Sequence, residues 1–277
     1  MEFNEGFVLL SNYQRLLKTS EFKEIEVYSN LFLESNKDVL LQYGHKWVSD
    51  PLHQWSRQWE YPYVFSRINK YLQTRDNPKV LDAGSGLTFF PYLISDKISN
   101  STITCCDYDI NLKKLYDKIN NKNSKNVSFV SADLRKTPFM AKSFDVIYCI
   151  SVLEHTKNYR EILGEFSRIL TENGLLIVTF DISIDGKSEI SFSGFKKLIA
   201  DISEKFVSID SEKFNEISDC QQLPPDIICT HHFRKVNAKL LPWKFPILYS
   251  IFHSIRKGQM PDFKLPNLTC ACFSFLK

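Results

Sequence analysis

The stretch Lys79-Val-Leu-Asp-Ala-Gly-Ser-Gly86 decides the fold of this 277-residue chain. An apolar strand ends here in an acidic residue, Asp82, and glycines follow at Gly84 and Gly86. Glycines at this spacing let the backbone turn tightly and approach a ligand closely. A dinucleotide-binding turn would have a third glycine where Phe89 stands, so this turn disfavours a nicotinamide or flavin cofactor.

Around this turn, short apolar runs alternate with amphipathic stretches, which is typical of parallel strands joined by helices. Helices are expected at 159–170 and 195–202. The pattern predicts an α/β fold with a Rossmann-like sheet of seven strands. We expect these strands at 79–81, 101–106, 127–130, 144–150, 175–180, 206–209 and 268–276.

The regions outside this alternating pattern predict two additions to the core. Residues 1–75 have helical periodicity and are expected to form an N-terminal cap that contributes to the active site. Six of the eleven prolines lie within about 219–266, which predicts an insertion or lid inside the main domain at 76–277.

Composition narrows the function classes. A formal net charge of +3 argues against nucleic acid as a partner, and no apolar run reaches the roughly 20 residues of a membrane helix. The acidic N-terminus lacks the features of a signal peptide, so we expect a cytoplasmic protein without a membrane partner. The seven cysteines lack zinc-binding spacing, which predicts buried reduced thiols and no metal.

Acidic residues follow the first three strands in order. Asp82 opens the glycine turn, Asp107 follows the strand at 101–106, and Asp133 follows the strand at 127–130. Each alone could be an ordinary helix cap. Together they resemble the motifs of class I S-adenosylmethionine-dependent methyltransferases, and the resemblance covers about residues 79–183. It implies S-adenosylmethionine as the cofactor and S-adenosylhomocysteine as the product.

The resemblance also implies roles for individual residues. In that family the glycine turn accommodates the methionine part of the cofactor, Asp107 binds the ribose hydroxyls, and Tyr108 covers the adenine. The loop after the third strand binds the adenine, and the fourth strand ends at the methyl-donor pocket. The cofactor residues implied are Asp82, Ala83, Gly84, Ser85, Gly86, Asp107, Tyr108, Asp133, Leu134 and Ile150.

The exit of the fourth strand, Ser151-Val-Leu-Glu-His155, bears on the acceptor. It has neither the Pro-Pro-aromatic run of DNA amino-methyltransferases nor a Pro-Cys nucleophile, so methylation of nucleic-acid bases fits poorly. His155 is a candidate general base, because a histidine can transfer protons near neutral pH. The alternative is a structural role, in which Glu154 and His155 fix the turn.

An aromatic-rich segment lies at residues 47–65 and is expected either to attach the cap or to line the pocket. In the second case, Trp55, Trp59 and Tyr61 would form pocket walls, and the face of Trp59 would lie against the cofactor's cationic sulfonium. Glu60 would bind an acceptor amine.

A basic cluster lies inside the predicted lid, at His231, His232 and Arg234. It is either a solvated loop or a site that binds a carboxylate or phosphate of the acceptor.

The sequence therefore predicts a methyltransferase with a small-molecule acceptor, most simply an amine nitrogen of a natural-product or sugar-type metabolite. An O-methyltransferase of a sugar or secondary metabolite is one alternative. The others are a protein or RNA methyltransferase and a non-catalytic protein that binds the cofactor. The oligomeric state is left open.

Overall fold

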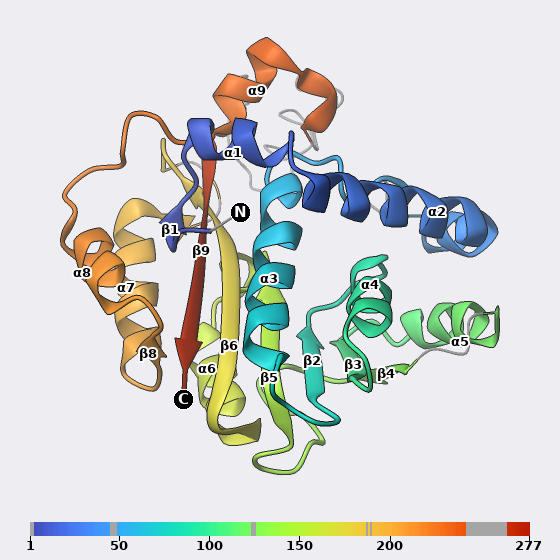
Figure 1. Cartoon of the computed structure of the whole chain (residues 1–277). Coiled ribbons are helices and arrows are strands. Elements are labelled where there is room, and N and C mark those ends of the chain that lie inside the picture. Colours follow the sequence, from blue (N-terminus) through green and yellow to red (C-terminus); the bar gives the residue numbers. More distant parts are fainter. Residues whose placement is uncertain (1–2, 45–48, 123–125, 187, 189, 242–264) are drawn as a thin grey trace, which may run out of the picture.

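The computed structural model describes residues 3–44, 49–122, 126–186, 188, 190–241 and 265–277. One mostly parallel sheet forms its centre, in the strand order β1-β9-β6-β5-β2-β3-β4 (Figure 1). Strand β9 runs antiparallel between β6 and β1. The predicted Rossmann-like α/β fold is therefore confirmed. The strands along this order are β1 (Gly6–Phe7), β9 (Leu268–Leu276), β6 (Leu170–Ser183), β5 (Phe144–Ile150), β2 (Lys79–Ala83), β3 (Thr102–Asp107) and β4 (Val127–Ser131).

Helices cover both faces of the sheet (Figure 1). One face packs against α2 (Ser20–Tyr43), α3 (Arg57–Leu72), α4 (Phe90–Lys97) and α5 (Leu112–Lys122). The other face packs against α6 (Tyr159–Ile169) and α7 (Phe192–Ser203). The remaining elements are α1 (Leu10–Leu16), α8 (Ser211–Asp219), α9 (Thr230–Val236), β7 (Ile190–Ser191) and β8 (Val207–Ser208).

Strand β6 is buried on both faces, which explains the continuous apolar run at residues 175–180. Leu175 and Ile177 join the core on the α3 side, whereas Leu176 and Val178 join the core on the α6 side. A strand buried on both faces reads as a continuous apolar run rather than an alternating one. Thr179, within this run, points to the α3 side, where it donates a hydrogen bond to Glu60.

The N-terminal region is more than a helical cap, because its β1 extends the sheet beside β9. This two-residue strand is too short to leave a period in the sequence. Helix α2 begins after Thr19, whose hydroxyl accepts a hydrogen bond from the backbone N–H of Phe22 at 3.2 Å. It ends at Gly44, which has a φ of 73° and so takes a left-handed conformation that favours glycine.

Within the predicted lid at 219–266, residues 242–264 lie outside the described residues. None of the helices in the described ranges has the length and apolar character of a membrane span.

The topology positions the site. The parallel strands β2, β3, β5 and β6 all end at the same edge of the sheet. Strand β2 lies between β3 and β5, so the chain crosses over in opposite directions on its two sides. Ligands of such sheets bind beyond the carboxyl ends of the strands at this point.

Candidate active site

A cavity of about 470 Å³ opens at this edge of the sheet. Its volume falls within the range of about 300–1,000 Å³ that is usual for small-ligand sites. Asp107 on β3 and Asp181 on β6 both line it. Because three strand intervals separate β3 from β6, the cavity extends about 14 Å across the sheet. It can therefore hold an extended ligand, or two ligands end to end.

The glycine turn forms the floor of the cavity. Gly84 and Gly86 have φ values of 80° and 52°, and the backbone N–H groups of Gly84 and Ser85 both donate to the carbonyl of Cys106. A Cβ atom on Gly84 would lie 2.4 Å from Cγ2 of Val152. Only glycine therefore fits where the turn packs against the end of β5.

Asp107 both shapes the turn and faces the cavity. Its Oδ2 accepts a hydrogen bond from the backbone N–H of Gly86 at 3.0 Å, and its Oδ1 accepts one from Asp109 at 3.1 Å. Tyr108, beside it on the rim, is 85% exposed. The carboxylate is thereby fixed, and the tyrosine ring is accessible.

Asp82 lies on the cavity floor at the end of β2. Burial, with a smaller contribution from the negative charge of Asp107, raises its pKa to about 8. A bound cation would stabilise the ionised carboxylate, so this position suits a positively charged ligand.

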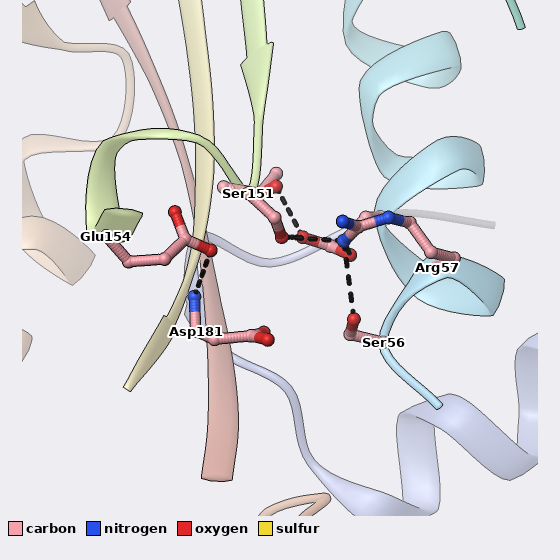
Figure 2. A network of polar contacts seen from close by, with 7 residues as sticks. Ser56, Arg57, Ser151, Glu154 and Asp181 are labelled. Atoms are coloured by element: carbon pink, nitrogen blue, oxygen red, sulfur yellow. Dashed lines mark hydrogen bonds and ion pairs between the residues drawn. The ribbon is translucent and has the colours of Figure 1, made fainter. Parts of the chain in front are cut away.

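A buried polar network joins α3 to the ends of β5 and β6 (Figure 2). Arg57 and Glu60 form an ion pair on the first turn of α3, and Arg57 also donates to Ser151 Oγ at 2.6 Å. The hydroxyl of Ser151 donates to Glu60 Oε1 at 2.8 Å, and that of Thr179 donates to the same oxygen at 2.5 Å. Burial opposes the charge of Arg57, but Glu60 offsets this effect and holds the pKa of Arg57 above its usual value.

The turn after β5 connects to β6 through a second contact (Figure 2). Glu154 Oε1 accepts a hydrogen bond from the backbone N–H of Asp181 at 3.0 Å, and burial raises the pKa of Glu154 to about 7. His155 follows on the same turn and lines the cavity, with an exposed side chain. Asp181 and His155 thus line the β6 side of the cavity, and Glu154 lies behind them.

Comparison with known proteins places this site in a family. A family described as a methyltransferase domain matches residues 81–178, which span β2 to β6 and hence much of the cavity floor. An uncharacterized protein of Methanocaldococcus jannaschii is 35% identical over 191 residues, covering 64% of this chain and 79% of that protein. The chain is a class I methyltransferase.

Two further likenesses agree with this assignment. The (S)-coclaurine N-methyltransferase of Thalictrum flavum is 30% identical over 107 residues, which cover 38% of this methyltransferase and only 29% of the plant enzyme. The geranyl diphosphate C-methyltransferase of Streptomyces coelicolor, solved with S-adenosylhomocysteine, has the same fold. Its TM-score is 0.51 at 10% identity, covering 77% of this chain and 78% of that one.

The cavity fits S-adenosylmethionine, the cofactor that the sequence resemblance implies. The glycine turn leaves room for close approach of the methionine part, and the fixed carboxylate of Asp107 can accept hydrogen bonds from ribose hydroxyls. The buried Asp82 suits the cofactor's positive charge.

The predicted cofactor residues divide into two groups. Those on the cavity wall are Asp82, Gly84, Ser85, Gly86, Asp107, Tyr108 and Ile150. Ala83, Asp133 and Leu134 lie outside the lining. The carboxylate of Asp133 is occupied by the guanidinium of its neighbour Arg135. An adenine contact by Asp133 would therefore require this ion pair to rearrange.

The aromatic segment also divides. Trp55 and Tyr61 line the cavity, as does His155, but Trp59 and Glu60 do not, contrary to expectation. Trp59 packs edge-on against Phe3 with ring centroids 5.1 Å apart, and Glu60 lies behind Ser151. The reason is helical geometry. Residues 57 and 61 share one face of α3, and residue 59 points roughly to the opposite side.

The basic cluster likewise lies away from the cavity. His231, His232 and Arg234 are on α9, outside the residues that line the site. Arg234 donates to the backbone carbonyl of Pro266 at 2.9 Å and so secures the chain before β9. Of the two alternatives for this cluster, its position outside the lining favours a role away from the acceptor.

Sequence reasoning missed several residues of the site, among them Arg57, Ser151 and Asp181. Asp181 directly follows the apolar run at 175–180, which is the same signal that identified Asp82, Asp107 and Asp133. Arg57 and Ser151 left no comparable signal, because they are 94 positions apart in the sequence.

Proposed function

We propose that this methyltransferase transfers the methyl group to an amine nitrogen of a small molecule. The charge of the cavity supports this proposal. Four carboxyl groups line it, whereas the guanidinium of Arg57 is already paired with Glu60. Such a cavity favours a cation, which would also stabilise the ionised form of the buried Asp82, and disfavours an anionic acceptor. The carboxyl groups are those of Asp82, Asp107, Asp109 and Asp181.

Asp181 is the carboxylate best placed for the acceptor. It lies two residues beyond Thr179, which pairs with Ile150 across the β5–β6 ladder. One strand interval and two residues of rise place its Cα about 8 Å from that of Ile150. Asp82, Asp107 and Asp109 lie toward the β2–β3 side, where the cofactor is expected. Asp181 therefore lies at the opposite end of the cavity, on the β6 side.

Aromatic rings complete the walls around this end. Trp55, Tyr61 and Tyr148 line the cavity, and aromatic faces attract cations. These rings and Asp181 suit a protonated amine that carries an apolar body. The name of the plant relative, an N-methyltransferase, agrees with this reading, although the similarity covers only part of that enzyme.

The chain's own task is orientation. Bound S-adenosylmethionine supplies an electrophilic methyl group, and methyl transfer is an in-line displacement, so alignment and exclusion of water provide much of the rate. Asp181 can accept hydrogen bonds from the acceptor's N–H groups and so hold its nitrogen toward the cofactor. His155, on the rim, can take up the proton that the ammonium form must lose.

The test is a comparison of matched acceptors. Purified protein is given methyl-labelled S-adenosylmethionine and pairs of compounds that differ only in nucleophile, such as phenethylamine with 2-phenylethanol and amino sugars with their parent sugars. We expect label to enter the amine of a pair and not the alcohol. Consistent transfer to the alcohols would refute the proposal and favour an O-methyltransferase.

The Asp181→Asn variant tests the proposed anchor. Because a hydrogen bond to a charged group is worth about 1.5–3 kcal/mol, the KM for the amine should rise about 10- to 150-fold. The Asp109→Asn variant is the matched control, since it also removes a cavity carboxylate but lies at the other end. It should leave the KM for the amine within about threefold. Equal effects of the two substitutions would remove Asp181 from its proposed role.

A further inference from the structure

We infer that Glu60 is a positioning residue of the cofactor site: from helix α3 it holds the end of β5, at Ser151, in the backbone conformation that cofactor binding needs. This inference concerns the cofactor alone and does not depend on which acceptor is used. Helix α3 would then contribute to cofactor binding through Glu60.

The first observation is the placement of a buried charge. The side chain of Glu60 is fully buried, and its oxygens accept hydrogen bonds from Arg57, Ser151 and Thr179 (Figure 2). Well-packed apolar residues often stabilise a core as well as such an ion pair does. Stability alone therefore does not explain the buried carboxylate of Glu60. A need to hold its hydrogen-bond partners in a fixed geometry does explain it.

The second observation is the backbone of Ser151. Its φ of 49° lies in the left-handed region, which a residue with a Cβ enters only against a steric penalty. Hydrogen bonds from both the backbone and the side chain hold Ser151 in this conformation. The backbone N–H of Ser151 donates to Thr179 O at 2.9 Å, and its hydroxyl is held between Arg57 and Glu60. Strain held in this way is typical of functional sites.

The third observation connects Ser151 to the cofactor turn. The next residue, Val152, packs so closely on Gly84 that any Cβ there would lie 2.4 Å from its Cγ2 and 3.0 Å from its Cγ1. A shift of Ser151 would therefore move Val152 against the glycine turn. Direct contacts and the chain itself therefore connect Glu60, through Ser151 and Val152, to Gly84.

Glu5 provides a matched control. It precedes β1 and is also buried against α3, where its carboxylate forms an ion pair with Arg67 at 2.8 Å and accepts a hydrogen bond from Tyr63 at 2.7 Å. It also accepts one from the backbone N–H of Ser274 at 2.7 Å. None of these groups lines the cavity. Glu5 and Glu60 thus have similar chemistry but different access to the site.

The experiment compares Glu60→Gln with Glu5→Gln by calorimetric titration with S-adenosylhomocysteine, alongside thermal unfolding. We expect both variants to unfold at lower temperature than the wild type. The Kd for S-adenosylhomocysteine should rise at least tenfold in Glu60→Gln and stay within twofold in Glu5→Gln. An unchanged Kd in folded Glu60→Gln, or equal losses in both variants, would overturn the inference.

A second pair of variants leaves Glu60 intact. Ser151→Ala removes the hydroxyl but keeps the penalty of the left-handed backbone, so its Kd should rise about tenfold. Ser151→Gly also removes the hydroxyl but has no such penalty, so its Kd should rise less than that of Ser151→Ala. In the Ser151→Gly background, Glu60→Gln should then have little further effect on the Kd. Equal affinity of the alanine and glycine variants, or an undiminished effect of Glu60→Gln, would refute the role of Glu60.

Discussion

Replacing Gly84 with alanine should both destabilise the protein and disable its cofactor turn. The substitution should lower the free energy of unfolding for two separate reasons. Gly84 has a φ of 80°, where an L residue is strained, and the new methyl group would lie 2.4 Å from Val152 Cγ2. Val152 belongs to the turn after β5, so this turn must move to relieve the close contact.

The magnitude follows from these two costs. A left-handed backbone costs a non-glycine residue about 1–2 kcal/mol, and overpacking a tight contact costs about 1–3 kcal/mol. The free energy of unfolding should therefore fall by about 2–5 kcal/mol. At about 2–4 °C per kcal/mol for a chain of this size, the midpoint of unfolding should fall by about 4–20 °C.

Thermal unfolding and titration with S-adenosylhomocysteine measure both effects, and two companion variants separate the causes. Gly164→Ala is the control, because this glycine lies inside α6 with nothing within 4 Å of the added Cβ. It should raise stability by about 0.5–1 kcal/mol. Adding Val152→Ala to Gly84→Ala should recover the overpacking cost only. Wild-type stability and affinity in Gly84→Ala would refute this account of the turn.

Two further predictions concern pH. His53 contacts the carboxylates of Asp50 and Glu26, and the hydrogen bond to Asp50 is the main cause that raises its pKa from 6.5 to about 9. The stability it contributes should be complete below about pH 6.5 and lost as the pH rises through 9. Urea unfolding from pH 6 to 9.5 should show a decline that is smaller in His53→Asn, and equal slopes would contradict the assignment. For Asp82, burial raises the pKa from 3.8 to about 8, so the fold disfavours its ionised form and stability should decrease between these two values. Asp82→Asn should accordingly raise the unfolding temperature at pH 8.5 and weaken binding of S-adenosylhomocysteine. An unfolding temperature below that of the wild type would show that the ionised carboxylate stabilises the fold.

Much of the fold was predictable because it depends on local patterns. The strand at 144–150 was predicted with the bounds of β5, and that at 268–276 with the bounds of β9. Strand β6 is longer than the predicted 175–180, since it extends from Leu170 to Ser183. Polar residues at 171–173 and 181 interrupt the apolar pattern near both ends, so the continuous apolar run covers only the middle.

The glycine turn and the carboxylates after β2 and β3 could also be identified from the sequence. Each residue lies at the carboxyl end of a strand or in the turn that follows it, and parallel strands bring their carboxyl ends to one edge. Position along the chain therefore predicts position in space for Gly84, Gly86, Asp82 and Asp107. The same rule would have identified Asp181 near the end of β6.

Only the tertiary structure decided the role of helix α3. The sequence determined that residues 57–61 are helical and aromatic, but not that Arg57 and Tyr61 face the cavity while Trp59 joins the core. Nor did it show that Glu60 would meet Ser151 and Thr179, which lie 91 and 119 positions away. The physical reason is that helical periodicity fixes which residues share a face, whereas the docking of the helix on the sheet decides what each face meets.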